Sequence, residues 1–196
     1  MPKMSEETKK RIIEAGAELI HTKGFNNTGL QDILKAAGVP KGSFYFYFKN
    51  KEDFGIEVVN HYAQFFRALI SDILNDESRP PLERLQSFFR WFYNYFESHG
   101  YRRGCPIGNL GQEMGDLSTA FQLRLQQSID GLAAALKKVL LEAQRNGDLA
   151  HNVDCGEMAY FIISAWQGAM IRMKVMKNGE PLKLFHKYVF TQLLRS

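Results

Sequence analysis

The sequence predicts an all-α fold: an N-terminal three-helix head that contains a helix-turn-helix, followed by a C-terminal helical bundle, with about nine helices in total. Apolar residues recur at helical spacing along nearly the whole chain, and no segment shows the alternation of a β-strand. A short amphipathic segment, a glycine turn and an aromatic second segment lie within residues 24–51. Two C-terminal segments are apolar around most of their circumference, which predicts burial on several sides.

The elements of the head follow from local signals. The first helix is expected to end at Lys23-Gly24, since glycine favours a helix C-terminus. Thr28 and Gln31 have the spacing of a capping box and predict that the second helix starts there. Gly38 should break that helix in a short turn, and Pro40 suits the first position of the third, which is expected over residues 40–46.

The remaining helices are predicted from caps and breakers. Asn50 should cap a fourth helix that reaches about residue 74, and Asp154 should cap the eighth. At about 1.5 Å per residue the fourth helix is roughly 35 Å long, enough to connect the head to a separate body. We therefore expect two domains, residues 1–50 and residues 51–196. The other helices are predicted at 82–98, in a short stretch from 106, at 118–146 and after the turn at 178–181.

Composition and charge narrow the class of protein. The chain has 196 residues, of which 45% are hydrophobic, so it can bury a sizeable core. Its net charge is +4, and residues 1–50 supply +3 of this with eight Lys or Arg against five Asp or Glu. No segment has the length and apolarity of a membrane span or a signal core, which predicts a cytoplasmic protein without a membrane partner. No metal set, cofactor motif or catalytic constellation is recognisable, so an enzyme is not expected.

The sequence of residues 41–54, KGSFYFYFKNKEDF, resembles the signature of the TetR family of one-component bacterial transcription regulators. The resemblance covers about the first sixty residues. It implies an all-helical homodimer whose three N-terminal helices bind operator DNA and whose other helices hold a small inducer. The chain departs from the family pattern at Tyr47, where histidine is frequent, and at Phe46, which has no polar group. Base preference therefore cannot be transferred from a relative.

Roles in the head can be assigned from physics and from the resemblance. Phe44 and Phe48 lie four residues apart and should pack into the core. The family pattern places the aromatic residues between them at the DNA surface, where a phenol can bind a phosphate and an aromatic face can contact a thymine methyl. Charged and polar groups near the helix N-termini are suited to phosphates or base edges. The predicted DNA-binding residues are Thr28, Lys41, Gly42, Ser43, Tyr45, Phe46, Tyr47 and Lys51.

The segment 82–98 contains seven aromatic residues, too many for one narrow apolar stripe. One interpretation is an ordinary core. The other is a pocket for a small, flat or apolar effector, because aromatic walls with a few polar groups are typical of such sites. The predicted effector-binding residues are Trp91, Tyr95, Cys105, Met114, Phe121, Trp166 and Met170.

Cys105 is the candidate reactive residue of the chain. Pro106 should open a short helix with Cys105 at its N-cap, and Arg102 and Arg103 precede it, so that thiolate is favoured. The run 104–110, GCPIGNL, followed by DLS at 116–118, is similar to a TetR subgroup that senses electrophiles, quinones or hypochlorite through a cysteine at this place. The alternative is a small buried residue. Cys155 is the weaker candidate, since the adjacent acidic residues should raise its pKa.

The apolar C-terminal segments predict a four-helix bundle shared by two subunits, although they could instead cover the core of their own subunit. The favoured function is a repressor that leaves a palindromic operator on double-stranded DNA when a small-molecule or electrophilic effector binds. The alternatives are an activator or partner-controlled regulator of the same fold, and a thiol-dependent helical enzyme. The predicted dimer-interface residues are Trp166, Ala169, Phe185, Val189 and Leu193.

Overall fold

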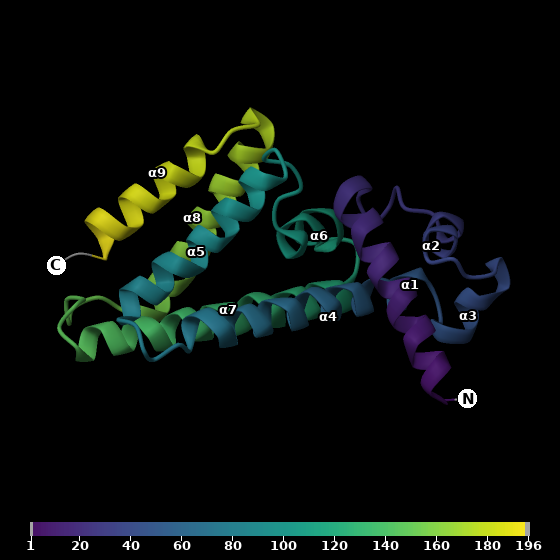
Figure 1. Cartoon of the computed structure of the whole chain (residues 1–196), viewed down its shortest axis with the longest axis horizontal. Coiled ribbons are helices and arrows are strands. Elements are labelled where there is room, and N and C mark those ends of the chain that lie inside the picture. The colour runs from purple at the N-terminus through teal and green to yellow at the C-terminus, as the bar shows by residue number, and fades with distance from the viewer. Residues whose placement is uncertain (1, 195–196) are drawn as a thin grey trace. The chain divides into compact units, whose positions relative to one another are not determined.

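The structure, a computed structural model, describes residues 2–194, with side chains from residue 6 onward, and every regular element in that range is helical (Figure 1). A 3₁₀ turn at Lys41–Ser43 precedes α3, and π-helical turns at Ile70–Leu74 and Val189–Leu193 extend α4 and α9. The prediction of an all-α fold with about nine helices is confirmed for the described residues. The α-helices are α1 (Pro2–Lys23), α2 (Leu30–Ala36), α3 (Phe44–Tyr47), α4 (Lys51–Leu69), α5 (Pro81–Ser98), α6 (Pro106–Met114), α7 (Thr119–Arg145), α8 (Cys155–Met176) and α9 (Glu180–Tyr188).

Packing divides the chain into two compact units. The head unit contains the residues up to Phe65 together with Pro106–Ser128, and the body unit contains Phe66–Cys105 together with the residues from Ile129 onward. The chain crosses from the body unit to the head unit at the Cys105–Pro106 peptide bond. These units are defined by packing and not by function. The functional division into residues 1–50 and 51–196 therefore stays a proposal.

Three phenylalanines form the centre of the head unit. Phe44 and Phe48 of the α3 region and Phe54 of α4 are each at most 2% exposed. Their ring centroids lie 5.1 Å apart for Phe44 and Phe48, 5.7 Å for Phe44 and Phe54, and 5.0 Å for Phe48 and Phe54. These are the tilted and edge-to-face arrangements that aromatic pairs prefer. The predicted core roles of Phe44 and Phe48 are confirmed.

The turn between α2 and α3 depends on a glycine. Gly38 has a φ of +63°, the left-handed conformation that side chains with a Cβ rarely adopt. The Val39 N–H donates to the Leu34 carbonyl at 3.0 Å, and the Gly38 N–H donates to the Lys35 carbonyl at 3.2 Å. These bonds satisfy carbonyls at the end of α2 and reverse the chain so that α3 follows in a new direction.

The predicted capping box at Thr28 is wrong. Helix α2 begins at Leu30, its N-cap is Gly29, and no side chain caps it. Thr28 is fully buried, and its hydroxyl donates backward to the Gly24 carbonyl at 2.6 Å instead of accepting from the helix. The predicted cap of α4 is confirmed, because the Asn50 Oδ1 accepts from the Asp53 N–H at 2.7 Å.

The body unit packs α5, α8 and α9 around an aromatic core, with α8 against α9 and α9 against α5 (Figure 1). The Phe89 ring centroid lies 5.0 Å from those of both Trp166 and Phe185. Helix α8 begins as predicted, since the Asp154 carboxylate accepts from the Gly156 and Glu157 N–H groups at 2.7 and 2.9 Å. The aromatic residues of 82–98 thus serve largely as core.

A buried ion pair ties three elements of the body unit together. Arg84 of α5 is 3% exposed and donates to the Leu74 carbonyl, at the end of the π-helical turn, at 2.8 Å. Its guanidinium also pairs with the carboxylate of Glu142 on α7. Within the described residues the Arg84 Nε has no hydrogen-bond partner. Both charges have been removed from water. The loss of either partner therefore leaves the other charge buried and unpaired, which costs a large free energy of desolvation.

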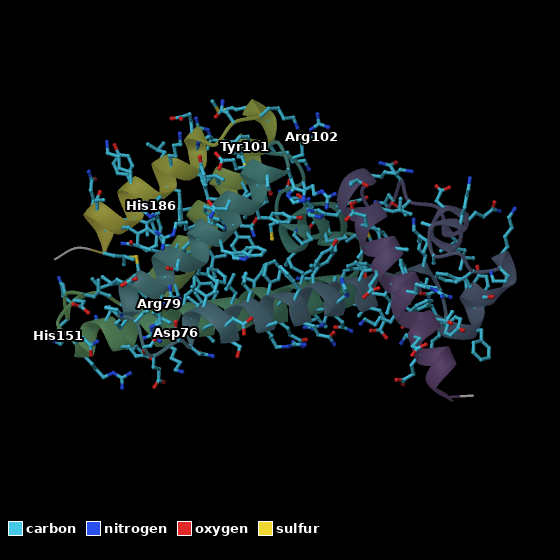
Figure 2. The ribbon with its side chains drawn as sticks, in the orientation of Figure 1. Asp76, Arg79, Tyr101, Arg102, His151 and His186 are labelled. Carbon is cyan, nitrogen blue, oxygen red and sulfur yellow. The ribbon has the colours of Figure 1, made fainter. Side chains whose placement is uncertain are left out.

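We predict that Arg84→Leu lowers the free energy of unfolding by about 3 kcal/mol, because Glu142 and the Leu74 carbonyl lose their partner. The double change Arg84→Leu with Glu142→Leu should recover most of that loss. The measurement is urea unfolding at one fixed protein concentration. Arg79→Leu is the matched control, since Arg79 pairs with Asp76 at the surface (Figure 2) and its removal should hardly move the midpoint. Equal destabilisation by the two single variants would contradict the role given to Arg84.

Candidate nucleic-acid interface and effector region

Helix α3 and the 3₁₀ turn before it present two large aromatic side chains to solvent. Tyr45 is 70% exposed and Phe46 is 76% exposed. Tyr47 is half-buried, with its ring edge-on to that of Phe46 at 5.0 Å. Two large aromatic side chains exposed at neighbouring positions make this part of α3 a candidate interaction surface.

The N-terminal end of this surface is polar and basic. Lys41 and Gly42 are exposed, Ser43 is half-buried, and the Ser43 N–H donates to the Pro40 carbonyl at 3.0 Å. Lys49 follows α3 and is also exposed. Lysines on either side of an aromatic helix provide the positive charge that attracts a phosphate backbone.

Two predicted DNA-binding residues also support the turn between α1 and α2. The buried hydroxyl of Thr28 is bonded to Gly24. The Lys51 ammonium donates to the Asn26 carbonyl at 3.4 Å and lies 4.7 Å from the centre of the Phe25 ring. Burial lowers the pKa of Lys51, and the negative charge of Glu113 acts in the opposite direction. Both residues therefore have structural partners within the head unit.

Glu113, near the end of α6, was not predicted from the sequence. Its carboxylate accepts from the backbone N–H of Phe25 at 2.7 Å and from that of Asn26 at 2.6 Å. These contacts join residues 88 and 87 positions apart, so no local sequence pattern could have revealed them. The carboxylate binds the first two amides that follow the glycine at the end of α1.

The predicted effector residues fall into two groups. Met114 and Phe121 belong to the head unit, where the Asn26 side chain donates to the Met114 sulfur at 3.9 Å and the Phe121 ring lies 5.1 Å from that of Phe25. Trp166 and Met170 are buried in the core of the body unit. Trp91, Tyr95 and Cys105 are half-buried members of the same unit.

One side of α5 carries an aromatic ladder formed by Trp91, Tyr95 and His99. The rings of Trp91 and Tyr95 are stacked, with an interplanar angle of 7° and a centroid separation of 5.6 Å. The Tyr95 and His99 rings lie 4.3 Å apart, and the His99 Nδ1 is 2.7 Å from the Tyr95 carbonyl oxygen. The ladder combines flat aromatic surface with polar groups at its C-terminal end.

The loop that follows the ladder is strained. Gly100, Tyr101, Arg103 and Gly104 have φ values of +64°, +56°, +76° and +89°. Left-handed conformations cost energy at the two residues that are not glycine and persist only where neighbours enforce them. Tyr101 is labelled in Figure 2. Its hydroxyl donates to the Glu97 carboxylate, near the end of α5, at 3.0 Å. Hydrogen bonding with Tyr93, burial and Glu97 together raise the pKa of Tyr101.

The two cysteines differ in setting. Cys105 follows the strained loop and immediately precedes α6, which begins at Pro106 as predicted. Cys155 is the first residue of α8 and is 4% exposed. Burial raises the pKa of Cys155, and the charge of Asp154 adds to this, while Lys137 opposes it. The thiol of Cys155 is therefore buried, and its environment disfavours the thiolate form.

Most of the predicted dimer-interface residues are buried within a single chain. Trp166, Ala169, Phe185 and Val189 are between 2% and 8% exposed, whereas Leu193 is 40% exposed. Helices α8 and α9 nevertheless leave other apolar side chains open to solvent. These are Tyr160, Phe161, Ile171, Val175, Met176, Leu184 and Tyr188.

Comparison with known proteins identifies the family. Residues 12–58 match the family described as "Bacterial regulatory proteins, tetR family", and residues 81–189 match "Tetracyclin repressor-like, C-terminal domain". The chain therefore belongs to the TetR family and is a DNA-binding transcriptional regulator of that family. Dimerisation is typical of the family. Across residues 2–194 no helix combines the length and apolarity needed to cross a membrane.

Similarity extends over most of the length of several relatives. The transcriptional regulator AcuR of Cereibacter sphaeroides is 40% identical over 89% of this chain and 80% of its own. The HTH-type transcriptional repressor DhaR of a Mycobacterium species is 35% identical over 96% of this chain and 93% of its own. The crystal structure of reduced NemR from Escherichia coli has a TM-score of 0.87 and 27% identity, covering 97% of this chain and 98% of that one.

Proposed function

We propose that the protein is a repressor that binds a palindromic operator as a homodimer and leaves it when an effector binds. The observation that carries the proposal is the exposure of Tyr45 and Phe46 on a basic helix-turn-helix. The repressor DhaR, 35% identical, supports repression rather than activation. Activation and control by a partner protein use the same DNA contacts, so they differ from repression only in the effect on transcription.

The roles proposed on DNA follow from exposure. Lys41, Gly42 and Ser43 face base edges or nearby phosphates, and the Tyr45 hydroxyl and the Phe46 ring contact a phosphate and a thymine methyl, respectively. Tyr47 completes this surface. Lys51 and the α2 N-terminus beside Thr28 contribute positive potential in addition to their structural contacts. The operator-binding domain proposed is residues 1–50, and residues 51–196 bind the effector and the second subunit.

We propose that the apolar face of α8 and α9 receives the second copy. Phe161, Gly168 and Val175 lie on one side of α8, and a Cβ at Gly168 would have no neighbour within 4 Å. A second helix could therefore approach closely there. A two-fold dimer places two heads on half-sites one helical turn, roughly 34–36 Å, apart, which matches a palindrome.

The effector proposed is small and either aromatic or electrophilic. The aromatic ladder of the body unit offers stacking surface, Trp166 and Met170 lie in the core of the same unit, and Cys105 follows the ladder after the loop of residues 100–104. The resemblance of residues 104–110 to cysteine-based sensors supports a covalent effector, and a relative of similar fold has been described in a reduced form. Binding, not catalysis, and a cytoplasmic location are proposed for the protein.

The operator surface is tested with DNA selected from a random pool by the purified protein. Tyr45→Ala and Lys41→Ala should each weaken operator binding by roughly 1–3 kcal/mol without lowering the melting temperature, because both side chains are exposed. Affinity should fall linearly with the logarithm of salt concentration, with a slope of about −0.9 per phosphate contacted. Fluorescence anisotropy measures both. Leu117→Ala, which removes an exposed side chain distant from α3 in sequence, is the control, and unchanged affinity in both test variants would refute the interface.

The dimer is tested with Val175→Glu. Val175 is 76% exposed, so the fold should survive, while two buried carboxylates would split a dimer formed by α8 and α9. Light scattering should report about 22.5 kDa for this variant and about twice that mass for the wild type. Leu117→Glu, also at an exposed apolar residue, should leave the dimer intact. A wild-type mass of one chain would contradict the proposal.

The covalent effector is tested with N-ethylmaleimide. The Cys105 thiolate sulfur bonds to one carbon of the maleimide double bond, and the neighbouring carbon takes a proton from water. Alkylation should weaken operator binding by the wild type by about 5–150-fold, the usual range of allosteric coupling. Cys105→Ser should abolish the effect, and Cys155→Ser should retain it, since the Cys155 thiol is buried with a raised pKa. Quinone and hypochlorite are compared in the same way. Equal release of wild type and Cys105→Ser would leave a reversible ligand as the effector.

A further inference from the structure

We propose that Glu113 is the positioning residue that couples α6 to the DNA-reading helix, through the turn formed by Gly24, Phe25 and Asn26. This inference rests on the proposed operator binding but concerns a different part of the molecule. The carboxylate is not a DNA contact. It acts by fixing the backbone from which α2 and α3 follow.

The first step of the argument is the chemistry of the turn. Gly24, with a φ of +88°, ends α1, and its N–H donates to the Ile20 carbonyl at 2.8 Å. The next two N–H groups, of Phe25 and Asn26, both point at the Glu113 carboxylate. Hydrogen bonds to an ionised acceptor are shorter and stronger than neutral ones, and two donors on one carboxylate also fix its orientation. The N–H groups of Phe25 and Asn26 follow the end of α1, and the Glu113 carboxylate of α6 is their hydrogen-bond acceptor.

The second step is that the turn is hydrogen-bonded to Thr28, two residues before α2 begins. The Thr28 hydroxyl donates to the Gly24 carbonyl at 2.6 Å, and the Thr28 N–H donates to the Phe25 carbonyl at 3.3 Å. Helix α2 starts two residues later and passes through the Gly38 turn into α3. A displacement of the Glu113 carboxylate therefore changes the direction in which the reading helix is presented.

The third step is that α4 and α6 act on the same turn from different contacts. Lys51 of α4 donates to the Asn26 carbonyl, and its ammonium covers the Phe25 ring. Met114, next to Glu113, accepts from the Asn26 side chain. The peptide groups of the turn thus donate to an anion from α6 and accept from a cation from α4. A shift of either helix changes the hydrogen bonds that hold the turn.

The fourth step is the position of α6 in the chain. Its first residue, Pro106, follows Cys105, where the chain leaves the body unit. The helix is nine residues long and carries Glu113 at its eighth position. In this proposal, a change in the backbone at Cys105, from a ligand or a covalent adduct, would reach the carboxylate through this one short helix. Coupling of this kind requires an element with two arrangements that both sites influence.

Hydrogen exchange on three proteins tests the proposal: wild type, Glu113→Gln and Asp116→Asn. Glutamine keeps the shape but places a neutral oxygen and an NH₂ donor against two N–H donors. Asp116→Asn removes an exposed carboxylate three residues further along and is the matched control. In the free proteins the amides of Phe25 and Asn26 should exchange on the order of tenfold faster in Glu113→Gln and unchanged in Asp116→Asn. This measurement needs no DNA.

The same three proteins are then compared with bound operator, using the duplex selected by the wild type. By linkage, if α6 influences the reading helix, operator binding must influence α6. Exchange across residues 106–114 should slow on DNA binding in the wild type and in Asp116→Asn, and this slowing should be lost in Glu113→Gln although the duplex still binds. Equal slowing in all three proteins would overturn the proposal.

The outcomes separate the two proposals. If the wild type selected no duplex, operator binding would fail while the exchange of Phe25 and Asn26 still reported on the turn. Glu113→Asp covers the case in which Glu113→Gln is generally unstable, because it keeps the charge and shortens the reach. If both variants exchanged faster throughout residues 6–65, together with a lower melting temperature, Glu113 would be a stability residue and the positioning role would be refuted.

Discussion

The burial of Phe44 and Phe48 is the constraint on which the DNA-reading surface depends. Phe44 begins α3 and Phe48 is the C-cap four residues later, so after about 100° of turn per residue both point to one side and pack on Phe54. Tyr45 and Phe46 are then rotated by about 100° and 200° away from that side and must face solvent. The same packing that stabilises α3 therefore leaves Tyr45 and Phe46 exposed to solvent, on the surface proposed to bind the operator.

Sequence reasoning succeeded where the determining signal is local. The caps at Asn50 and Asp154, the break at Gly38 and the core role of Phe44 and Phe48 each depend on residues within a few positions. The prediction failed at Thr28 because a threonine hydroxyl can either accept from the N–H groups of the following helix or donate to a preceding carbonyl. In the buried setting of Thr28 it donates to the Gly24 carbonyl. The capping spacing with Gln31 was present, but the helix starts after Gly29, so a local pattern was outweighed by the packing of the turn.

Non-local contacts were beyond prediction. The apolar pattern of α8 and α9 predicts burial on several sides, yet it cannot say which apolar side chains belong to the core of the protomer. Trp166, Ala169, Phe185 and Val189 fill the protomer core, which leaves side chains such as Phe161 and Val175 on the outer face. Aromatic richness likewise could not show that Phe121 packs on Phe25 in the head unit while Trp91 and Tyr95 stack in the body unit. Glu113 left no sequence signal because its partners are backbone amides, which every residue has.

The head unit is assembled from segments that are distant in the sequence, and this has a functional consequence. A head of residues 1–50 alone would lack Phe54, the third member of its phenylalanine core. It would also lose Lys51, Glu113, Met114 and Phe121 around the turn between α1 and α2. Its backbone amides would then be solvated, and the turn could adopt other directions at little cost. By taking its orientation from α4 and α6, the reading helix becomes sensitive to whatever moves those helices. A regulator needs this dependence, because an effector changes DNA affinity only if the two binding sites share an element whose arrangement both of them influence.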